Sequence, residues 1–512
     1  MRNRLSFILI ILILSGCAAN RPAKQITLGG RKPFAVKPVR GVERLGREIE
    51  AILQDSLLLT TNVGLKVVRV RDGRVLYERN SRKFFHPASN MKLFVAAAAL
   101  IYLGPDYRFV TRVATDSGAA VSDTLHGNIY LIGSGNPDFS FGDLAYLVES
   151  LYAAGIRYVA GDIICDDSYL DDIRYGNGWM WDEGSSDLYA PIGALTVQDN
   201  SVDVYVAPEK EAGLPARVWL VPATDYVKLI NQTVTVAGAK TNGLAEDSLP
   251  SYEPLEVERR WRTGENIIDV TGTVPIDSPI QVTGVNIVDP TRYFGTLFWE
   301  LCRRMGIEIA GEVKTGAAPE HARLLARHVS PPLSTIITNM NKPSDNLSAE
   351  LLLKVIGAET MGPPGTADKG IFVIKKMLAG WGADTSHVQF ADGSGVSRYN
   401  LVTPDLLVRL LVQVYRDFTI RSEFIASLPI GGLDGTLARR MKQTAAMGVV
   451  HAKTGSLNGV STLSGYTLAY DGEVLAFSIM MSHFVEPARR YRQLQDQICD
   501  VLTRYAETVA FH

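Results

Sequence analysis

The chain has 512 residues, which is too many for one domain with a single hydrophobic core and suits two or three domains. Its 52 basic residues nearly balance 54 acidic ones and form no basic stripe, which argues against a nucleic-acid partner. The eight histidines show no metal-ligand spacing and no glycine-rich nucleotide loop occurs, so we predict no metal and no cofactor.

Residues 1–17 have the features of a bacterial secretion signal. Arg2 and Arg4 begin it, and the apolar stretch LSFILIILIL that follows is too short for a stable membrane span. The stretch ends in Leu-Ser-Gly-Cys, which resembles a lipobox and implies cleavage before Cys17 and lipidation of that cysteine. Since the next residue is alanine and not aspartate, we expect a lipid anchor on the periplasmic side of a bacterial membrane, the outer membrane preferred. Residues 18–40 would then be a flexible tether. The alternative is an ordinary signal peptide with an incidental cysteine.

The next elements predict a strand hairpin followed by a helix. Residues 62–79 alternate in polarity around Asp72-Gly73, which indicates two antiparallel strands. The run SNMKLFVAAAAL then begins a helix at Ser89, which places Ser89 and Lys92 on one face of its first turn. A lysine amine in that position can take the proton of the hydroxyl, and the helix N-terminus favours developing negative charge. Alone, the pair could also be an ordinary helix start with Lys92 solvated.

From about residue 110 to 290 the sequence is rich in strands and in turns containing Gly and Asp. Helical patterns return afterwards, at 293–305, 331–341, 346–357, 366–381 and 404–417. A strand near residue 453, a hairpin at 460–482 and a last helix from about 487 complete the chain. The fold class is therefore α/β of the α+β type, with one antiparallel sheet, helices packed on it and a β-rich insertion. Cys165, Cys302 and Cys499 are far apart and odd in number, and we predict no disulfide.

Two further short motifs accompany Ser89 and Lys92. The triplet Ser344-Asp345-Asn346 precedes a predicted helix, where it could also be a simple cap. The triplet Lys453-Thr454-Gly455 lies on a predicted strand followed by another strand. A second copy, Lys314-Thr315-Gly316, precedes a loop containing proline, and we interpret it as a surface turn. S-x-x-K, S-x-N and K-T-G in this order are the elements of active-site serine enzymes that bind penicillin.

The sequence as a whole resembles the class C low-molecular-mass penicillin-binding proteins, a D-alanyl-D-alanine carboxypeptidase/endopeptidase family. The long separation between Lys92 and Ser344 is typical of this family, whose β-lactamase/transpeptidase-like domain is split by inserted domains. The resemblance extends over nearly all of the mature chain and includes GSGNP at 133–137, GWMW at 178–181, SPPL at 330–333, DGSG at 392–395 and GTL at 435–437.

The resemblance also implies a domain plan. Residues 41–110 and 290–512 would form the catalytic domain, and residues 111–289 the β-rich insertion. The insertion would comprise a second domain and a third one nested near 195–250.

The residue chemistry and the family together imply roles for the motif residues. Ser89 would attack the carbonyl between two D-alanines of a peptidoglycan peptide, with Lys92 as general base. Ser344 would pass the proton to the leaving amine, and Asn346 would orient Lys92 and the substrate amide. The carboxylate of the substrate, or of a β-lactam antibiotic acting as covalent inhibitor, would be held by a second set of residues: Lys453, Thr454 and Gly455, with the N–H of Ser456 in the oxyanion hole.

Several residues are candidates for gripping the substrate peptide. Arg398 matches a position that the family directs toward the cleft, and Asn458 follows the K-T-G strand. From the insertion, Asp182, Glu183 and Tyr189 could reach the peptide side chain. We interpret the neighbouring Trp179 and Trp181 as core of the insertion.

Two other functions remain possible at this point. A β-lactamase would share all three motifs, but it would need a deacylating group, and no E-x-x-L-N segment occurs. A catalytically silent cell-wall-binding lipoprotein would have no use for the serine–lysine pair.

Overall fold

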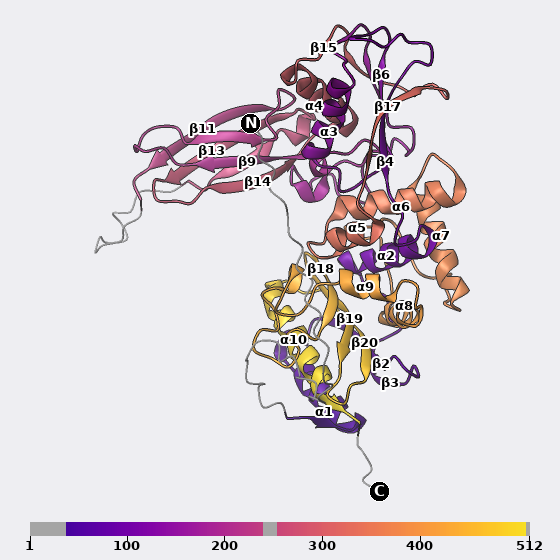
Figure 1. Ribbon diagram of the computed structural model, residues 1–512. Coiled ribbons are helices and arrows are strands. Elements are labelled where there is room, and N and C mark those ends of the chain that lie inside the picture. Colours follow the sequence, from indigo (N-terminus) through magenta and orange to yellow (C-terminus); the bar gives the residue numbers. More distant parts are fainter. Residues whose placement is uncertain (1–36, 239–252, 508–512) are drawn as a thin grey trace, which may run out of the picture. The chain divides into compact units, whose positions relative to one another are not determined.

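The computed structural model describes residues 37–238 and 253–507 (Figure 1). The predicted signal peptide, Cys17 and most of the tether lie outside the described residues. The prediction of a tether as far as residue 40 is wrong at its end, because β1 (Val39–Arg40) pairs in parallel with β21 (Tyr505–Ala506). The Val39 side chain is fully buried, so it joins the core instead of a linker.

The central sheet of the catalytic region has five strands in the order β18-β19-β20-β2-β3, all antiparallel. Its strands are β2 (Asn62–Arg69), β3 (Val75–Arg79), β18 (His451–Leu457), β19 (Val460–Leu468) and β20 (Val474–Ser482). The predicted single antiparallel sheet, made from strands near both ends of the chain, is thus confirmed.

The sheet is buried on both faces, as the side chains of β20 show. Phe477, Ile479 and Met481 belong to one hydrophobic core, whereas Ala476 and Met480 belong to another. Successive strand residues point to opposite faces, so this alternation places the sheet between two apolar layers.

Helices form both layers. One side holds α2 (Met91–Tyr102), α5 (Leu333–Asn341), α6 (Asn346–Met361), α7 (Ala367–Gly380), α8 (Pro404–Arg416) and α9 (Arg421–Ser427). The other side holds α1 (Val42–Leu53) and α10 (Ala488–Arg504). The helices predicted from periodicity all occur. In these two layers, α1 and α9 are helices that the sequence analysis did not predict. Among the described helices, none is both long and apolar enough to cross a membrane.

The inserted region is rich in strands, as predicted, and its described residues also form two α-helices. Its five-stranded sheet has the order β16-β8-β6-β4-β17 and comprises β4 (Val110–Thr115), β6 (Ile129–Ile132), β8 (Ile163–Asp166), β16 (Val313–Thr315) and β17 (Arg323–Val329). The two helices α3 (Phe141–Ala153) and α4 (Pro290–Arg304) share a core with it. Ser140 and Asp143 form a capping box at the start of α3, a signal that the sequence carried.

The predicted boundary at residue 290 is wrong, because α4 packs in the insertion and not in the catalytic domain. Tyr293, Phe294 and Phe298 are buried in the core of the insertion, and β17 returns beside β4. The inserted region therefore closes at Val329, where two neighbouring strands lead the chain in and out.

Three small sheets complete the insertion. The nested region has β9 (Ser201–Ala207), β10 (Arg217–Val221) and β14 (Gln281–Asn286) in one sheet, and β11 (Lys228–Val236), β12 (Glu256–Arg259) and β13 (Ile267–Pro275) in another. These strands extend well beyond the predicted range of 195–250. The third sheet consists of the short strands β5 (Thr124–Leu125), β7 (Tyr158–Val159) and β15 (Glu308–Ile309).

Candidate active site

Ser89 lies in a short 3-10 turn, η2 (Ala88–Asn90), that leads directly into α2. The preceding Ala88 is buried and has a φ of 47°, an uncommon conformation for alanine. The loop at Gly395 presses against it, since a Cβ at this glycine would lie 1.8 Å from the Ala88 carbonyl oxygen. The turn is therefore fixed by its surroundings, which holds the Ser89 hydroxyl in one place.

Lys92 is fully buried and its amine contacts three oxygens. The Nζ atom lies 3.1 Å from Ser89 Oγ, 2.7 Å from Asn346 Oδ1 and 2.7 Å from the carbonyl oxygen of Ser394. The last two groups can only accept hydrogen bonds. A neutral amine that donates to both therefore directs its lone pair at the Ser89 hydroxyl, the arrangement that a base requires.

The environment of Lys92 favours that neutral form. Burial lowers the pKa of Lys92 to about 8, against the opposing attraction of Asp345, Asp392 and Glu350. An appreciable fraction of the amine is thus free of its proton near neutral pH.

The Ser394 carbonyl is held in position by two buried carboxylates. Glu350 of α6 accepts hydrogen bonds from the N–H groups of Gly393 and Ser394, at 3.0 and 2.8 Å. Asp392 accepts from the N–H groups of Gly395 and Ser397, at 2.8 and 2.7 Å. Burial raises the pKa of Glu350, and the nearby Asp392 raises it further. Sequence reasoning missed Glu350, although it lies one helical turn after Asn346.

The S-D-N triplet connects the other motif residues. Ser344 has a φ of 73°, rare for a residue with a side chain, and its hydroxyl accepts a hydrogen bond of 2.7 Å from Lys453 Nζ. Asp345 caps the N-terminus of α6, which begins at Asn346. The amide of Asn346 bridges two regions, since its Oδ1 accepts from Lys92 and its Nδ2 donates to the carbonyl of Leu188 in the insertion, at 2.9 Å.

The K-T-G triplet lies on β18, the edge strand of the central sheet, and packs against the Ser89 turn. Asn90 Nδ2 donates to the Lys453 carbonyl at 3.1 Å. A Cβ at Gly455 would lie 2.2 Å from Thr462 Oγ1 and 2.8 Å from the Pro87 carbonyl, so only glycine permits this approach. Burial lowers the pKa of Lys453 well below its usual value, and the charge of Lys92 lowers it further. Ser89, Lys92, Ser344, Asn346 and Lys453 thus form one contiguous cluster.

The second K-T-G triplet is not part of this cluster. Lys314 and Thr315 lie on β16, the exposed edge strand of the inserted sheet, so the prediction of a surface turn is wrong. Lys314 is exposed and forms an ion pair of 2.6 Å with Asp162.

Comparison with known proteins identifies the family. A family model described as the D-Ala-D-Ala carboxypeptidase 3 (S13) family matches residues 45–505. The chain belongs to this family. It is 40% identical over 503 residues to a D-alanyl-D-alanine carboxypeptidase of an Actinomadura species, covering 95% of this chain and 89% of that one. It is 27% identical over 419 residues to the D-alanyl-D-alanine carboxypeptidase DacB of Haemophilus influenzae, covering 81% and 84%.

Solved structures show the fold. Penicillin binding protein 4 (dacB) from Haemophilus influenzae matches with a TM-score of 0.77 at 24% identity, covering 89% of this chain and 99% of that one. A second structure of that protein, complexed with a β-lactam, matches with a TM-score of 0.70. The predicted family, the α+β fold class and the class of serine-type D-Ala-D-Ala carboxypeptidases are thereby confirmed.

The remaining predicted residues of this family member surround the cluster. Thr454 Oγ1 contacts Thr436 Oγ1 at 2.8 Å, and Ser456 Oγ accepts from Arg492 Nη2 at 3.0 Å. Arg398 Nη2 donates to the Asn458 carbonyl at 2.8 Å, which connects the DGSG loop to the end of β18. Neither Thr436 nor Arg492 was a sequence candidate.

The insertion contributes a small aromatic pocket of about 230 Å³, which Glu183 and Tyr189 line together with tryptophans. Burial raises the pKa of Tyr189, and its hydrogen bond to Glu183 raises it further. Trp179 donates from Nε1 to Asp392 at 3.0 Å, and Trp181 is 80% exposed. The interpretation of these tryptophans as core of the insertion is therefore wrong. Asp182 is exposed, and the described residues provide it with no polar partner.

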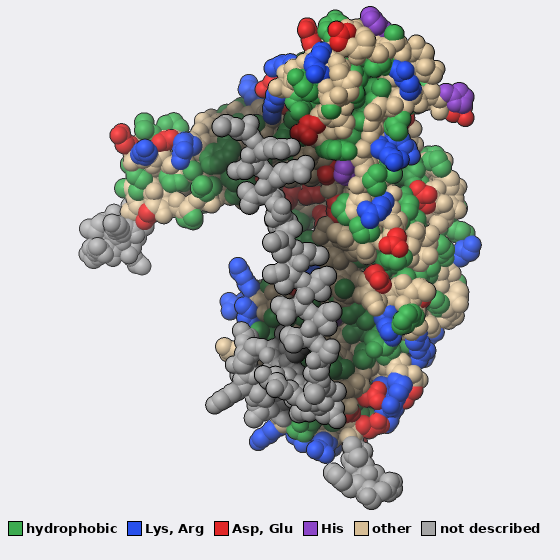
Figure 2. Space-filling model, viewed as in Figure 1, with side chains coloured by type: hydrophobic (Ala, Val, Ile, Leu, Met, Phe, Trp, Pro, Cys, Tyr) green, Lys and Arg blue, Asp and Glu red, His purple; other side chains and the backbone are tan. Residues whose placement is uncertain are grey.

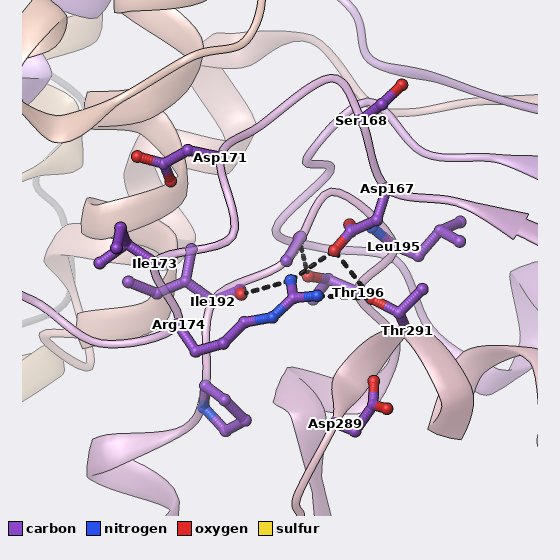
Figure 3. Close-up of polar contacts among 12 residues, drawn as sticks. Asp167, Ser168, Asp171, Ile173, Arg174, Ile192, Leu195, Thr196, Asp289 and Thr291 are labelled. Carbon is purple, nitrogen blue, oxygen red and sulfur yellow. Dashed lines mark hydrogen bonds and ion pairs between the residues drawn. The ribbon is translucent and has the colours of Figure 1, made fainter. Parts of the chain in front are cut away.

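The loop that carries this pocket is anchored at its base (Figure 3). Arg174 forms an ion pair with Asp167 and donates to Thr291 Oγ1 at 3.1 Å, which attaches the loop to α4. The buried amine of Lys354 of α6 forms an ion pair with the partly exposed Asp171. The helix that begins at Asn346 thus also holds the inserted loop close to the catalytic cluster.

Proposed function

We propose that this chain hydrolyses the D-alanyl-D-alanine bond of peptidoglycan stem peptides through an acyl-enzyme on Ser89, and that β-lactams acylate the same hydroxyl. The observation that carries the proposal is the contact of the buried Lys92 amine with Ser89 Oγ at 3.1 Å, with Asn346 and Ser394 accepting its other hydrogens. A scaffold protein would gain nothing from burying an amine beside a hydroxyl.

Acylation begins when the neutral Lys92 takes the Ser89 proton and Oγ attacks the carbonyl carbon. The N–H groups of Ser89 and Ser456 would stabilise the oxyanion, each donor contributing about 3 kcal/mol. The contact of η2 with β18 through Asn90 supports this pairing, because it holds the two segments side by side.

Collapse of the tetrahedral intermediate requires a proton on the leaving nitrogen. Ser344 is suited to deliver it, since its hydroxyl accepts a hydrogen bond of 2.7 Å from Lys453 Nζ, which could supply the proton that the hydroxyl gives up. Lys453 and Thr454 would bind the carboxylate of the leaving D-alanine, and water would then release the acyl group. Gly455 contributes by letting β18 lie this close to Ser89.

The substrate side chain would enter the space between the DGSG loop and the insertion. Arg398 lies close enough to Tyr189 to act electrostatically on its ring hydroxyl, and Glu183 hydrogen-bonds the same hydroxyl. These three residues, with Asn458 and the exposed Asp182, would grip a stem peptide that carries both an ammonium and a carboxylate group.

The arrangement disfavours a β-lactamase. The carboxylates that act on Lys92, those of Asp345, Asp392 and Glu350, already accept hydrogen bonds from backbone N–H groups. Because none of the three is free to activate water against an acyl-enzyme, acylation by penicillin should be long-lived.

For the location of the protein we propose a lipid anchor at Cys17, on the periplasmic side of a bacterial membrane. The support is the apolar leader that ends in Leu-Ser-Gly-Cys. A peptidoglycan hydrolase needs access to the wall, and such an anchor provides it.

Mass spectrometry of muropeptides tests the function. The purified chain without its leader should release D-alanine from a stem pentapeptide, and the Lys453→Ala variant should lose at least tenfold in kcat/KM because the substrate carboxylate loses its charged partner. The matched Lys314→Ala variant should retain full activity. No release by the wild type, or equal losses in both variants, would contradict the proposal.

A further inference from the structure

Two tryptophans that the proposed mechanism does not use lie next to each other at the surface of the insertion. Trp181 belongs to the loop that carries Glu183, and Trp261 belongs to η6 (Trp261–Thr263) of the nested region. Their ring centroids are 5.6 Å apart and their planes are inclined by 47°. Trp181 is 80% exposed, although tryptophan is on average one of the more buried residues in a folded protein.

The two indoles are part of a concentrated apolar patch. Met180 lines the same cavity and is 53% exposed. On the face shown in Figure 2, hydrophobic side chains are intermixed with polar and charged ones, so three large apolar groups in one place are not the general pattern of the surface. Such a concentration of exposed apolar groups indicates a binding site.

The two rings differ in how firmly they are held. Trp261 Nε1 donates to Glu258 Oε1 at 2.6 Å, and the guanidinium carbon of Arg262 lies 4.5 Å from the ring centroid. Among the residues that the structure describes, none accepts a hydrogen bond from Trp181 Nε1, and this exposed N–H is therefore available to a ligand. The pair thus combines a fixed ring with a ring that has a free donor.

The patch is continuous with the pocket proposed to hold the stem peptide. Trp181 and Trp261 line the same cavity of about 230 Å³ as Tyr189. The ring of Tyr189 packs edge-on against Trp179 with centroids 5.9 Å apart, and Trp179 donates to Asp392 of the DGSG loop. A row of aromatic rings therefore leads from the catalytic cluster to the exposed indole of Trp181.

The end of the cavity formed by the two tryptophans offers no free charge. Arg259 is the only cation in the described lining, and each of its guanidinium nitrogens donates to an oxygen of Asn286 or to the carbonyl of Glu265. The only carboxylate in the lining, that of Glu183, hydrogen-bonds the Tyr189 hydroxyl at the other end. A neutral group with apolar faces is therefore the best match for the tryptophan end.

The proposed substrate carries a group of this kind. The stem peptide is joined at its amino end to an amino sugar of the glycan strand, and the N-acetyl group of such a sugar is uncharged. One face of the sugar ring is a layer of C–H groups that can stack on an indole, and its hydroxyl and amide oxygens can accept from Trp181 Nε1. The cavity is smaller than the roughly 300 Å³ at which pockets for drug-sized ligands begin, so it suits a single ring.

We infer that Trp181 and Trp261 form a subsite for an amino sugar of the glycan strand, so that stem peptides attached to glycan are bound more tightly than free peptides of the same sequence. The inference rests on the proposed function, because the sugar belongs to the substrate whose D-alanyl bond Ser89 cleaves. The two indoles bind the sugar and take no part in proton transfer.

The test compares a free stem pentapeptide with the same pentapeptide attached to its disaccharide. The wild type should release D-alanine from the disaccharide-linked substrate with a kcat/KM at least tenfold higher, mainly through a lower KM. In Trp181→Ala the ratio of the two kcat/KM values should fall below twofold, because the sugar loses its stacking partner. Trp181→Phe keeps an aromatic face and should retain most of the preference, whereas Trp181→Leu, which is apolar but not planar, should lose it.

The matched control is Phe418→Ala, since Phe418 is 82% exposed but does not line the cavity. This variant should keep the full preference for the disaccharide-linked substrate. Saturation-transfer NMR with a soluble tetramer of N-acetylglucosamine provides a measurement that does not need catalysis. The wild type without its leader should transfer saturation to the sugar, and Trp181→Ala should not.

The outcomes separate the inference from the proposed function. A wild type that is acylated by penicillin and releases D-alanine equally well from both substrates would overturn the inference alone. A preference that Trp181→Ala leaves unchanged, or a wild type that transfers no saturation to the tetramer, would do the same. A wild type that is not acylated and releases no D-alanine from either substrate would overturn the proposed function and the inference together.

Discussion

At the scale of single residues, the site depends on how one amine is desolvated. Lys92 is surrounded by α2, α6 and the DGSG loop, and its hydrogen-bond partners are an amide, a carbonyl and a hydroxyl, none of which is charged. The carboxylates that favour its protonated form, those of Asp345, Asp392 and Glu350, each accept hydrogen bonds from backbone N–H groups. The carboxylates therefore do not bind the Lys92 amine directly, and burial keeps part of the amine neutral. A neutral amine can act as a base near neutral pH.

The rate of acylation should therefore depend on pH with a defined sign. Because the pKa of Lys92 is lowered to about 8, the reactive neutral fraction grows about tenfold per pH unit below that value and reaches half at about pH 8. Stopped-flow acylation by a chromogenic penicillin should rise accordingly and level off at higher pH. A rate independent of pH between about 6 and 9 would show that Lys92 is not the base.

At the scale of elements, the close packing of β18 against η2 determines whether the site forms. The K-T-G strand approaches the Ser89 turn so closely that a single methyl group at Gly455 would displace it. The other triplet, on β16, has no such neighbour, since a Cβ at Gly316 would lie 3.3 Å from one methyl carbon of Ile164.

These two glycines provide a matched pair of substitutions. Gly455→Ala should lower the free energy of unfolding by about 1–3 kcal/mol through overpacking and slow acylation at least tenfold. Gly316→Ala should stay within about 0.5 kcal/mol of the wild type and be acylated at the same rate. Urea unfolding and penicillin kinetics measure both effects. A Gly455→Ala variant with unchanged acylation would refute the importance of this packing.

The sequence predicted the cluster because its members lie in short motifs with fixed spacing. Ser89 and Lys92 are one turn apart, and Ser344 and Asn346 flank a helix cap, so local geometry determined their directions. The carbonyl of Ser394 could not be predicted in the same way, because every residue has a carbonyl and only tertiary packing directs this one to Lys92. Thr436 and Arg492 were missed for a similar reason, since they reach β18 from distant segments.

At the scale of the whole molecule, residues of the catalytic region and of the insertion contact each other at the boundary between the two. The insertion leaves at β4 and returns at β17, and these strands pair with each other. Most of the insertion has a core of its own, but Leu170, Ala190, Ile192 and Ala194 belong to the core of the catalytic region. Lys354, Asn346 and Trp179 make polar contacts across the boundary. The predicted boundary at residue 290 was misplaced because α4 has the pattern of an ordinary amphipathic helix, which does not indicate which core it joins.

The location of the protein is a property of the whole chain and can be tested separately from catalysis. If Cys17 carries the lipid, Cys17→Ser should yield an unprocessed or soluble protein, whereas the wild type fractionates with membranes. Cell fractionation with detection by fluorescent penicillin makes the comparison. A variant that fractionates and migrates like the wild type would exclude the lipid anchor.

The most direct test of the account is intact-mass analysis after incubation with penicillin. The wild type should gain the mass of one penicillin, and peptide mapping should place it on Ser89. The Ser89→Ala variant should remain unmodified while keeping its fold, since the loss of one hydroxyl at this turn costs only about 1 kcal/mol. A stable adduct on the variant, or none on the wild type, would show that Ser89 is not the nucleophile.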